Sequence, residues 1–156
     1  MLVIIGCGNP NRSDDGVGVV VAQALQAKLH AQPREDVRVF DAGTAGMEVM
    51  FQARGASRLV IIDASRSGSE PGAIFRVPGE ELALEHEPVF TLHDFRWDHA
   101  LAAGRRIFRE QFPEDVTVYL IEAASLDFGL GLSAAVQAAA DKVIADLAQL
   151  LETCDA

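Results

Sequence analysis

Two adjacent carboxylates, Asp14 and Asp15, lie in the loop that follows the first apolar run of the chain. That run, 2–5, is typical of a buried strand, and Gly6 and Gly8 follow it before the polar loop begins. In an open α/β sheet, ligands bind beyond the carboxyl ends of the strands. A phosphate group would be bound there by backbone N–H groups, Lys or Arg, whereas two carboxylates repel it. The loop therefore indicates a site for a cation or for acid–base chemistry.

Polar side chains also follow the other apolar runs of the chain. Asp41, Asp63 and Glu122 each come after a predicted strand, and His93 precedes a long helical segment. If these ends share one rim of the sheet, Asp15, Asp63 and His93 converge. Two carboxylates and one imidazole form a mixed oxygen and nitrogen ligand set that suits a divalent first-row metal with open positions.

Each of these residues also has a purely structural interpretation. We expect Asp14 to be the N-cap of the helix that follows its loop. Asp63 could cap the next turn, and Asp41 could brace the loop at Gly43. A lone histidine such as His93 is more often a surface or core residue than a ligand. Spacing alone leaves both interpretations open, because the residues are far apart in the sequence.

Composition limits the class of protein. With 156 residues, 49% of them apolar and 23% charged, the chain is expected to fold as one globular domain, residues 1–156, around a single core. A formal net charge of −10 argues against a nucleic-acid partner, which requires clustered Lys and Arg. No apolar stretch approaches the ~18 residues of a membrane span. Without a recognisable signal peptide, we expect a cytoplasmic protein with no membrane partner.

The elements that must position these residues follow from the hydrophobic periodicity. Strands are predicted at 2–5, 37–41, 58–63 and 116–121, with an edge strand at 73–77. Helices are predicted at 17–29, 47–54, 94–112 and 133–151, the last with Ser133 as its N-cap, and 80–88 is predicted to be a loop. This order is typical of an α/β fold, a three-layer α/β/α sandwich with a mostly parallel, about five-stranded sheet.

Four blocks of sequence stand in one order along the chain. They are Gly6-x-Gly8-Asn9 with Asp14-Asp15-Gly16-x-Gly18, then Asp41-Ala-Gly43-Thr44-Ala-Gly46-Met47-Glu48, then Ile61-Ile-Asp63-Ala64, and finally Leu92-His93-Asp94. Together they resemble the hydrogenase maturation endopeptidases, which trim the C-terminus of the large subunit of nickel–iron hydrogenases. The resemblance extends from Leu2 to about the last helix, and it implies an α/β/α sandwich.

The resemblance also implies a site and a partner. Asp15, Asp63 and His93 occupy the family's nickel-site positions, the first of which is often Glu in relatives. The nickel is implied to arrive with the substrate, a [NiFe]-hydrogenase large-subunit precursor, so no permanent cofactor is expected. Docked nickel could polarise the scissile carbonyl or lower the pKa of a water, and a carboxylate could take the proton of that water. Whether Asp15 is a ligand or the general base stays open.

The second block is expected to contact the backbone of the substrate, because glycine permits close approach. Its candidate residues are Asp41, Gly43, Thr44 and Gly46. The segment 122–125 departs from the Pro-Glu-Ser-like sequence of relatives, so the resemblance implies no substrate contact for it.

Two rival functions remain. One is a non-catalytic nickel-binding factor for hydrogenase assembly, which would use the same site without cleaving. The other is a small nucleotide- or phosphate-binding domain. Gly6 and Gly8 permit the second, but the third glycine of a dinucleotide fingerprint is absent and the carboxylates oppose it.

Overall fold

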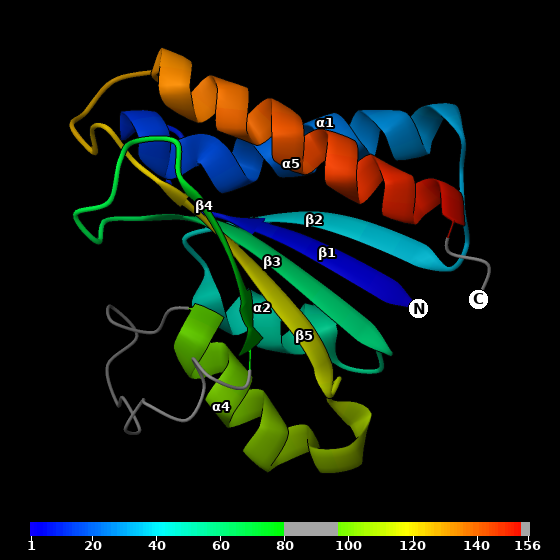
Figure 1. Cartoon of the computed structure of the whole chain (residues 1–156). Coiled ribbons are helices and arrows are strands. Elements are labelled where there is room, and N and C mark those ends of the chain that lie inside the picture. The colour runs from blue at the N-terminus through cyan, green and yellow to red at the C-terminus, as the bar shows by residue number, and fades with distance from the viewer. Residues whose placement is uncertain (80–96, 154–156) are drawn as a thin grey trace.

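The computed structural model describes residues 1–79 and 97–153, and Figure 1 shows how their elements are arranged. Along the chain these elements are β1 (Leu2–Cys7), η1 (Ser13–Gly16), α1 (Val17–Ala31), β2 (Val37–Gly43), α2 (Gly46–Ala53), β3 (Arg58–Ser65), β4 (Ile74–Pro78), α4 (Trp97–Phe108), η3 (Arg109–Gln111), β5 (Asp115–Glu122) and α5 (Ala134–Thr153). In this described part of the chain, no helix combines the length and the apolar character that a membrane crossing needs.

The five strands form one sheet in the order β2-β1-β3-β5-β4. β1 pairs in parallel with both β2 and β3, and β3 pairs in parallel with β5, whereas β4 is an antiparallel edge strand. The chain moves from β1 to one side to form β2 and then returns to the other side to form β3. The boundary between β1 and β3 is therefore the topological switch point, where open α/β sheets bind their ligands.

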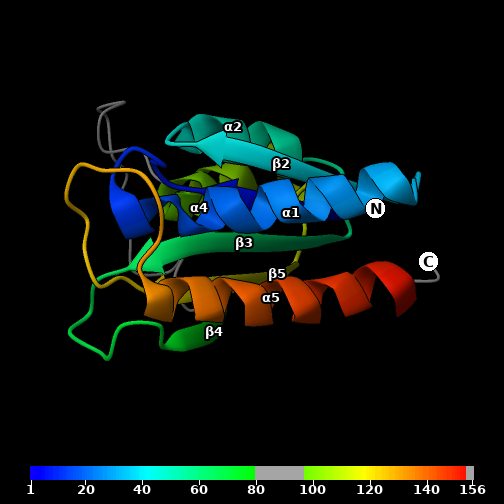
Figure 2. The same ribbon diagram turned by 90° about the horizontal axis from the view of Figure 1, so that it is seen from above.

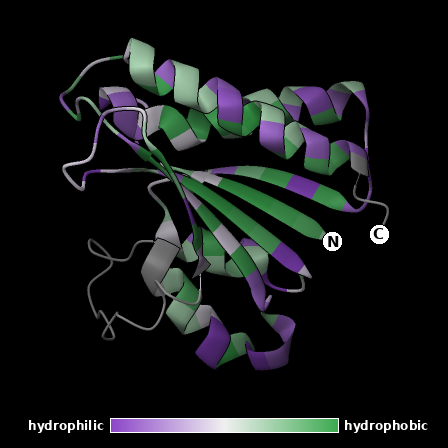
Figure 3. Cartoon of the chain, viewed as in Figure 1, coloured by the Kyte–Doolittle hydropathy of each residue, from purple (hydrophilic) through white to green (hydrophobic). Residues whose placement is uncertain are grey.

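Two layers of helices enclose the sheet, with α1 and α5 on one face and α2 and α4 on the other (Figure 1). Successive side chains of each strand point to opposite faces of the sheet. Leu2 and Ile4 of β1 pack in the core beneath α1 and α5, whereas Val3 and Ile5 pack in the core beneath α2 and α4. The strands are accordingly apolar along most of their length (Figure 3), as expected for a parallel sheet that is covered on both faces. This confirms the predicted α/β/α sandwich.

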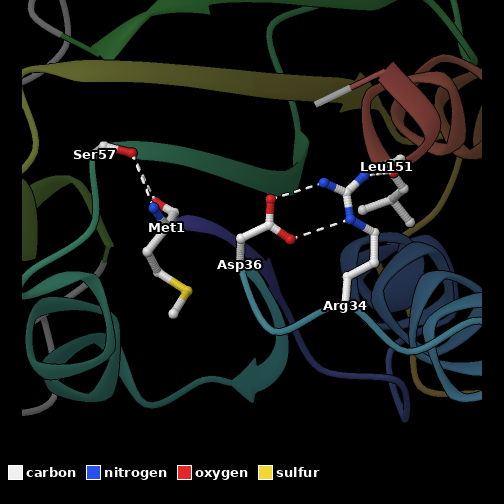
Figure 4. Close-up of polar contacts among 5 residues, drawn as sticks. All are labelled: Met1, Arg34, Asp36, Ser57 and Leu151. Atoms are coloured by element: carbon white, nitrogen blue, oxygen red, sulfur yellow. Dashed lines mark hydrogen bonds and ion pairs between the residues drawn. The ribbon is translucent and has the colours of Figure 1, made fainter. Parts of the chain in front are cut away.

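The amino-terminal end of the sheet is closed by polar contacts (Figure 4). Arg34 donates two hydrogen bonds to the Asp36 carboxylate, at 3.1 and 2.7 Å, and a third to the carbonyl of Leu151 near the end of α5. The hydrogen bonds from Arg34 hold the pKa of Asp36 below its ordinary value. The amino group of Met1 donates to the Ser57 hydroxyl at 3.2 Å. Met1, Asp36 and Ser57 directly precede β1, β2 and β3, so these contacts lie at the opposite end of the sheet from the site at the carboxyl ends of the strands.

The predicted helix at 94–112 differs most from the structure. Within the described residues it forms α4, which ends at Phe108 and is followed by the 3-10 turn η3. The reason is the backbone of Arg109, whose φ of 49° is left-handed and interrupts the α-helix before Pro113. The predicted loop at 80–88 and the first residues of the predicted helix, 94–96, lie outside the described residues.

The glycines of the first block let α1 approach the sheet closely. A Cβ atom on Gly6 of β1 would overlap the carbonyl oxygen of Gly18 in α1. A Cβ atom on Gly18 would in turn overlap the backbone carbonyl oxygens of Cys7 and Ile62. The first turn of α1 therefore packs directly on the backbones of β1 and β3, which fixes the preceding loop at the switch point.

Replacing Gly6 by Ala is expected to lower the free energy of unfolding by about 3 kcal/mol, because two backbone segments would have to separate. Urea unfolding measures the change. Gly68→Ala is the control, since nothing lies within 4 Å of the Cβ position of Gly68 and only its φ of 88° disfavours Ala there. The control should cost about 1 kcal/mol. Equal losses in the two variants would contradict the close-packing argument.

Candidate active site

The candidate site lies at the carboxyl ends of β1 and β3, on the two sides of the switch point. Asp15 belongs to η1, which follows β1 directly, and Asp63 belongs to the last half of β3. The parallel register of the two strands, in which Gly6 is opposite Ile62, brings their ends to the same rim. The shared rim on which the predicted convergence depends is therefore present for Asp15 and Asp63.

Gly8 is the point at which the segments of the site meet. Its N–H donates to the carbonyl of Gly43 at 2.8 Å, which ties the end of β1 to the end of β2. A Cβ atom on Gly8 would overlap the carbonyl oxygen of Asp15 and would lie 3.5 Å from Oδ1 of Asp63. Its φ of 128° also favours glycine. Gly8 is required here by both backbone conformation and close approach.

Backbone N–H groups hold both carboxylates. Oδ2 of Asp15 accepts a hydrogen bond from the N–H of Asn9 at 2.9 Å, and Oδ1 of Asp63 accepts one from the N–H of Ala64 at 2.8 Å. Asp63 is only 5% exposed, whereas Asp15 is half-buried. Within the described residues Asp15 is in no ion pair, and its other oxygen has no hydrogen-bond partner. Two carboxylates fixed along the Gly8–Asn9 backbone suit the binding of a cation.

The third predicted residue, His93, lies outside the described residues. Among those that are described, no three Asp, Glu, His or Cys side chains form a group that could hold a metal ion. The convergence of His93 with the two carboxylates thus stays a prediction.

Asp14 does not cap its own helix, and the N-cap prediction for it is wrong. The residue before α1 is Gly16, and no side chain caps that helix. The Asp14 side chain is instead fully buried and accepts hydrogen bonds from the segment between β5 and α5. Its donors are the N–H of Ala124 (2.8 Å), the N–H of Ser125 (3.2 Å), the N–H of Ser133 (2.7 Å) and the hydroxyl of Ser133 (2.9 Å).

The same hydrogen bonds set the ionisation of Asp14. Burial raises its pKa, but the N–H groups of Ser133 and Ala124, with the Ser133 hydroxyl, outweigh burial and hold the pKa below its ordinary value of 3.8. Ser133 directly precedes α5, as predicted, and its hydroxyl donates a hydrogen bond to Asp14. The carboxylate beside Asp15 is thus a structural anion that joins two loops.

Backbone contacts extend this connection, which we call the loop clamp: residues 11–14 bound to residues 124–133. Figure 2 shows the two segments side by side at one end of the molecule, ahead of α1 and α5. The further hydrogen bonds are Ser13 N–H to Gly129 O (2.9 Å), Gly129 N–H to Asn11 O (2.9 Å), Asp14 N–H to Ser125 O (3.2 Å), Ser13 hydroxyl to Asp127 O (2.8 Å) and Arg12 Nε to Leu126 O (3.3 Å). No local sequence signal predicts the clamp, because its two halves are more than 100 residues apart.

Of the candidate substrate-binding residues in the second block, only some lie near Gly8 at the rim of the sheet. Asp41 is exposed, and its Oδ1 accepts a hydrogen bond from the N–H of Gly43 at 3.0 Å, which confirms the bracing interpretation. Gly43, with φ of 55° and open space around its Cβ position, and the exposed Thr44 lie at the rim. Gly46, by contrast, is buried as the first residue of α2.

Glu122 is bound into the structure and takes no part in the carboxylate pair. It is buried, and it accepts hydrogen bonds from the Ser67 hydroxyl at 2.7 Å, the Ser67 N–H at 3.0 Å and the Ser65 hydroxyl at 3.2 Å. The hydrogen bond from the Ser67 hydroxyl is the main reason that the pKa of Glu122 lies below its ordinary value of 4.5. Its role is to hold the β3–β4 loop.

Fold and site together define a class of protein: an α/β/α sandwich with two carboxylates, those of Asp15 and Asp63, at its topological switch point. Comparison with known proteins identifies the family within this class. The family model of the HycI hydrogenase maturation protease matches residues 19–150. The chain belongs to the hydrogenase maturation protease family, as the four sequence blocks predicted.

Individual relatives agree with this assignment. The hydrogenase 2 maturation protease of Escherichia coli (strain K12) is 29% identical over 138 residues, which cover 88% of this chain and 82% of that protein. The hydrogenase expression/formation protein HoxM of Cupriavidus necator is 28% identical over 153 residues, 97% of this chain and 74% of that protein. The structure of the hydrogenase maturating endopeptidase HybD from E. coli superposes with a TM-score of 0.80 at 26% identity, over 98% of this chain and 93% of that one.

Proposed function

We propose that this protein is an endopeptidase that removes the C-terminal extension of a nickel-loaded [NiFe]-hydrogenase large-subunit precursor in the cytoplasm. The single observation that carries the proposal is the pairing of Asp15 and Asp63 along the Gly8–Asn9 backbone at the switch point, in a chain of the maturation protease family. The nickel ion belongs to the substrate in this proposal and is not a resident cofactor of the protease.

The donor set fits this role. Asp15 and Asp63 offer carboxylate oxygens, and His93 would add an imidazole nitrogen, a mixed set that accepts Ni²⁺ with positions left open. In this proposal the three residues recognise the nickel of the precursor, which restricts cleavage to subunits that have already received their metal. Asp15 is either a ligand or the base that takes the proton of the attacking water. Gly43 and Thr44 contact the backbone of the substrate.

Cleavage should depend on nickel in the precursor. We expect the large subunit to shorten, as seen by gel mobility and intact mass, when nickel-loaded precursor is mixed with the protein. Nickel-free precursor should be cut at least about 100-fold more slowly, since the ion that orients and polarises the scissile bond is missing. Equal cleavage of both forms would refute nickel recognition.

The same experiment tests the rival functions. Stable binding of nickel-loaded precursor without any shortening would favour the assembly factor. A nucleotide-binding domain would leave the precursor untouched and bind nucleotide instead. The structure opposes this last function, because the rim that would meet a phosphate carries the carboxylates of Asp15 and Asp63.

A further inference from the structure

Two large apolar side chains project from the loop between β5 and α5. Phe128 is 81% exposed and Leu130 is 84% exposed, more than any other large hydrophobic residue of the described chain. Each is followed by a glycine with a backbone that other residues rarely adopt, Gly129 with φ of 158° and Gly131 with φ of 91°. Both side chains therefore stay largely in water in the folded chain and gain little of the free energy that burial of apolar surface would provide.

The exposure is not a consequence of a loose loop. Gly129, between the two side chains, both donates a hydrogen bond to Asn11 and accepts one from Ser13, each 2.9 Å long. The guanidinium of Arg12 stacks on the Phe128 ring with its carbon 4.5 Å from the ring centroid. The loop clamp therefore fixes the backbone, and a cation–π contact fixes the aromatic ring.

The position of this pair relates it to the candidate site. The residues that hold it, 11–13, run directly into Asp14 and Asp15, so the apolar pair and the site carboxylate are carried by one connected unit. A protein whose peptide bond reaches Asp15 therefore meets the segment 11–15, to which the loop that carries the apolar pair is hydrogen-bonded. A rigid aromatic ring with a stacked Arg is the kind of anchor that dominates binding energy at protein interfaces, because little conformational entropy is lost.

We propose that Phe128 and Leu130, with Arg12 stacked on the ring, are a docking surface for the folded body of the large-subunit precursor. The choice of partner rests on the proposed function. Side chains that are 81% and 84% exposed protrude, and protruding anchors insert into a pocket of a folded partner. An extended peptide such as the C-terminal extension would instead need a groove or a strand edge on the protease.

The test measures binding separately from cleavage. Nickel-free precursor, which the proposed function expects to be cut at least about 100-fold more slowly, is immobilised. The affinity of each protease variant for it is measured by interferometry. The double variant Phe128→Ser/Leu130→Ser is expected to bind at least about tenfold more weakly than the wild type. Ile107→Ser is the matched control. Ile107 is 61% exposed in the last turn of α4, outside the loop clamp, and its loss should change the affinity less than about twofold.

Several outcomes would overturn the inference. They are unchanged affinity of the double variant, an equal loss in Ile107→Ser, or no binding of the wild type. A wild-type dimer that the double variant abolishes, with precursor binding unchanged, would make the surface a self-contact instead. Thermal unfolding of both variants at the wild-type temperature establishes that they are folded. If the wild type binds the precursor but does not cleave its nickel-loaded form, the proposed function alone is refuted. If the wild type cleaves the precursor and the double variant binds it as tightly as the wild type does, the docking inference alone is refuted.

Discussion

Replacing Asp63 by Asn is expected to slow the cleavage of nickel-loaded precursor by about 100-fold or more. The side chain of Asn keeps the shape of Asp and can still accept the hydrogen bond from the N–H of Ala64. It loses the negative charge that attracts the nickel ion of the substrate, and metal sites lose affinity steeply when the charge of a ligand is removed. His93→Ala should have a comparable effect if that residue is the third ligand.

Asp115→Asn is the matched control for this prediction. Asp115 lies at the first position of β5, opposite Arg58 at the other end of β3 from the site, and its side chain is 62% exposed. The control should retain cleavage within about twofold, because exposed charges far from a site have small effects. Quantified gels of the shortened subunit give both rates, and thermal unfolding checks that Asp63→Asn is folded. Similar rates for the two variants would remove Asp63 from the site.

Asp15→Asn, measured beside Asp63→Asn, separates the two roles left open for Asp15. A ligand contributes to binding, so its replacement should weaken the affinity for nickel-loaded precursor as well as the rate. A general base acts only on the proton of the attacking water, so its replacement should lower the rate and leave the affinity nearly unchanged.

Asp14→Asn is expected to lower the free energy of unfolding by about 3 kcal/mol. The carboxylate is fully buried and accepts four hydrogen bonds, from Ala124, Ser125 and twice from Ser133. An amide has one acceptor oxygen, and its NH₂ group would face donors, so at least one buried N–H loses its partner. Because Asp15 follows directly, the weakened clamp should also slow cleavage.

Asp127→Asn is the control for the clamp, since Asp127 is an exposed residue of the same loop that contributes only backbone groups to the hydrogen bonds described. Its replacement should change stability by less than about 0.5 kcal/mol in urea unfolding. If Asp14→Asn also lowered the free energy of unfolding by less than about 0.5 kcal/mol, the buried carboxylate would not be needed for stability.

The stability that Asp14 contributes should depend on pH in one direction. Because its pKa in the folded protein lies below the ordinary value of 3.8, folding favours the ionised form. The contribution is complete above the unfolded-state pKa and is lost as the pH falls through the lower folded-state pKa. The difference between wild type and Asp14→Asn should therefore be constant from about pH 7 to about pH 5 and should shrink in more acidic solution. A difference that grows on acidification would contradict this.

The sequence alone determined the layers of the protein and the family to which it belongs. Apolar runs long enough for buried strands alternate along the chain with segments of helical periodicity. This alternation is typical of a parallel sheet with helices on both faces. The sequence also made Asp15 and Asp63 candidates for one rim, because parallel strands joined by right-handed crossovers bring their carboxyl ends to one side. These features follow from local sequence patterns and from the general rules by which strands and helices connect.

Only the tertiary structure decided the roles of Asp14 and of the loop before α5. In sequence Asp14 has the pattern of an N-cap, since it is a carboxylate just ahead of a helix. Its hydrogen-bond partners, 110 to 119 residues further along the chain, are brought to it only when α5 packs beside α1. The same packing fixes the exposed positions of Phe128 and Leu130. Contacts between segments so distant leave no periodicity in the chain, which is why the first loop could be predicted as a site but not as one half of a clamp.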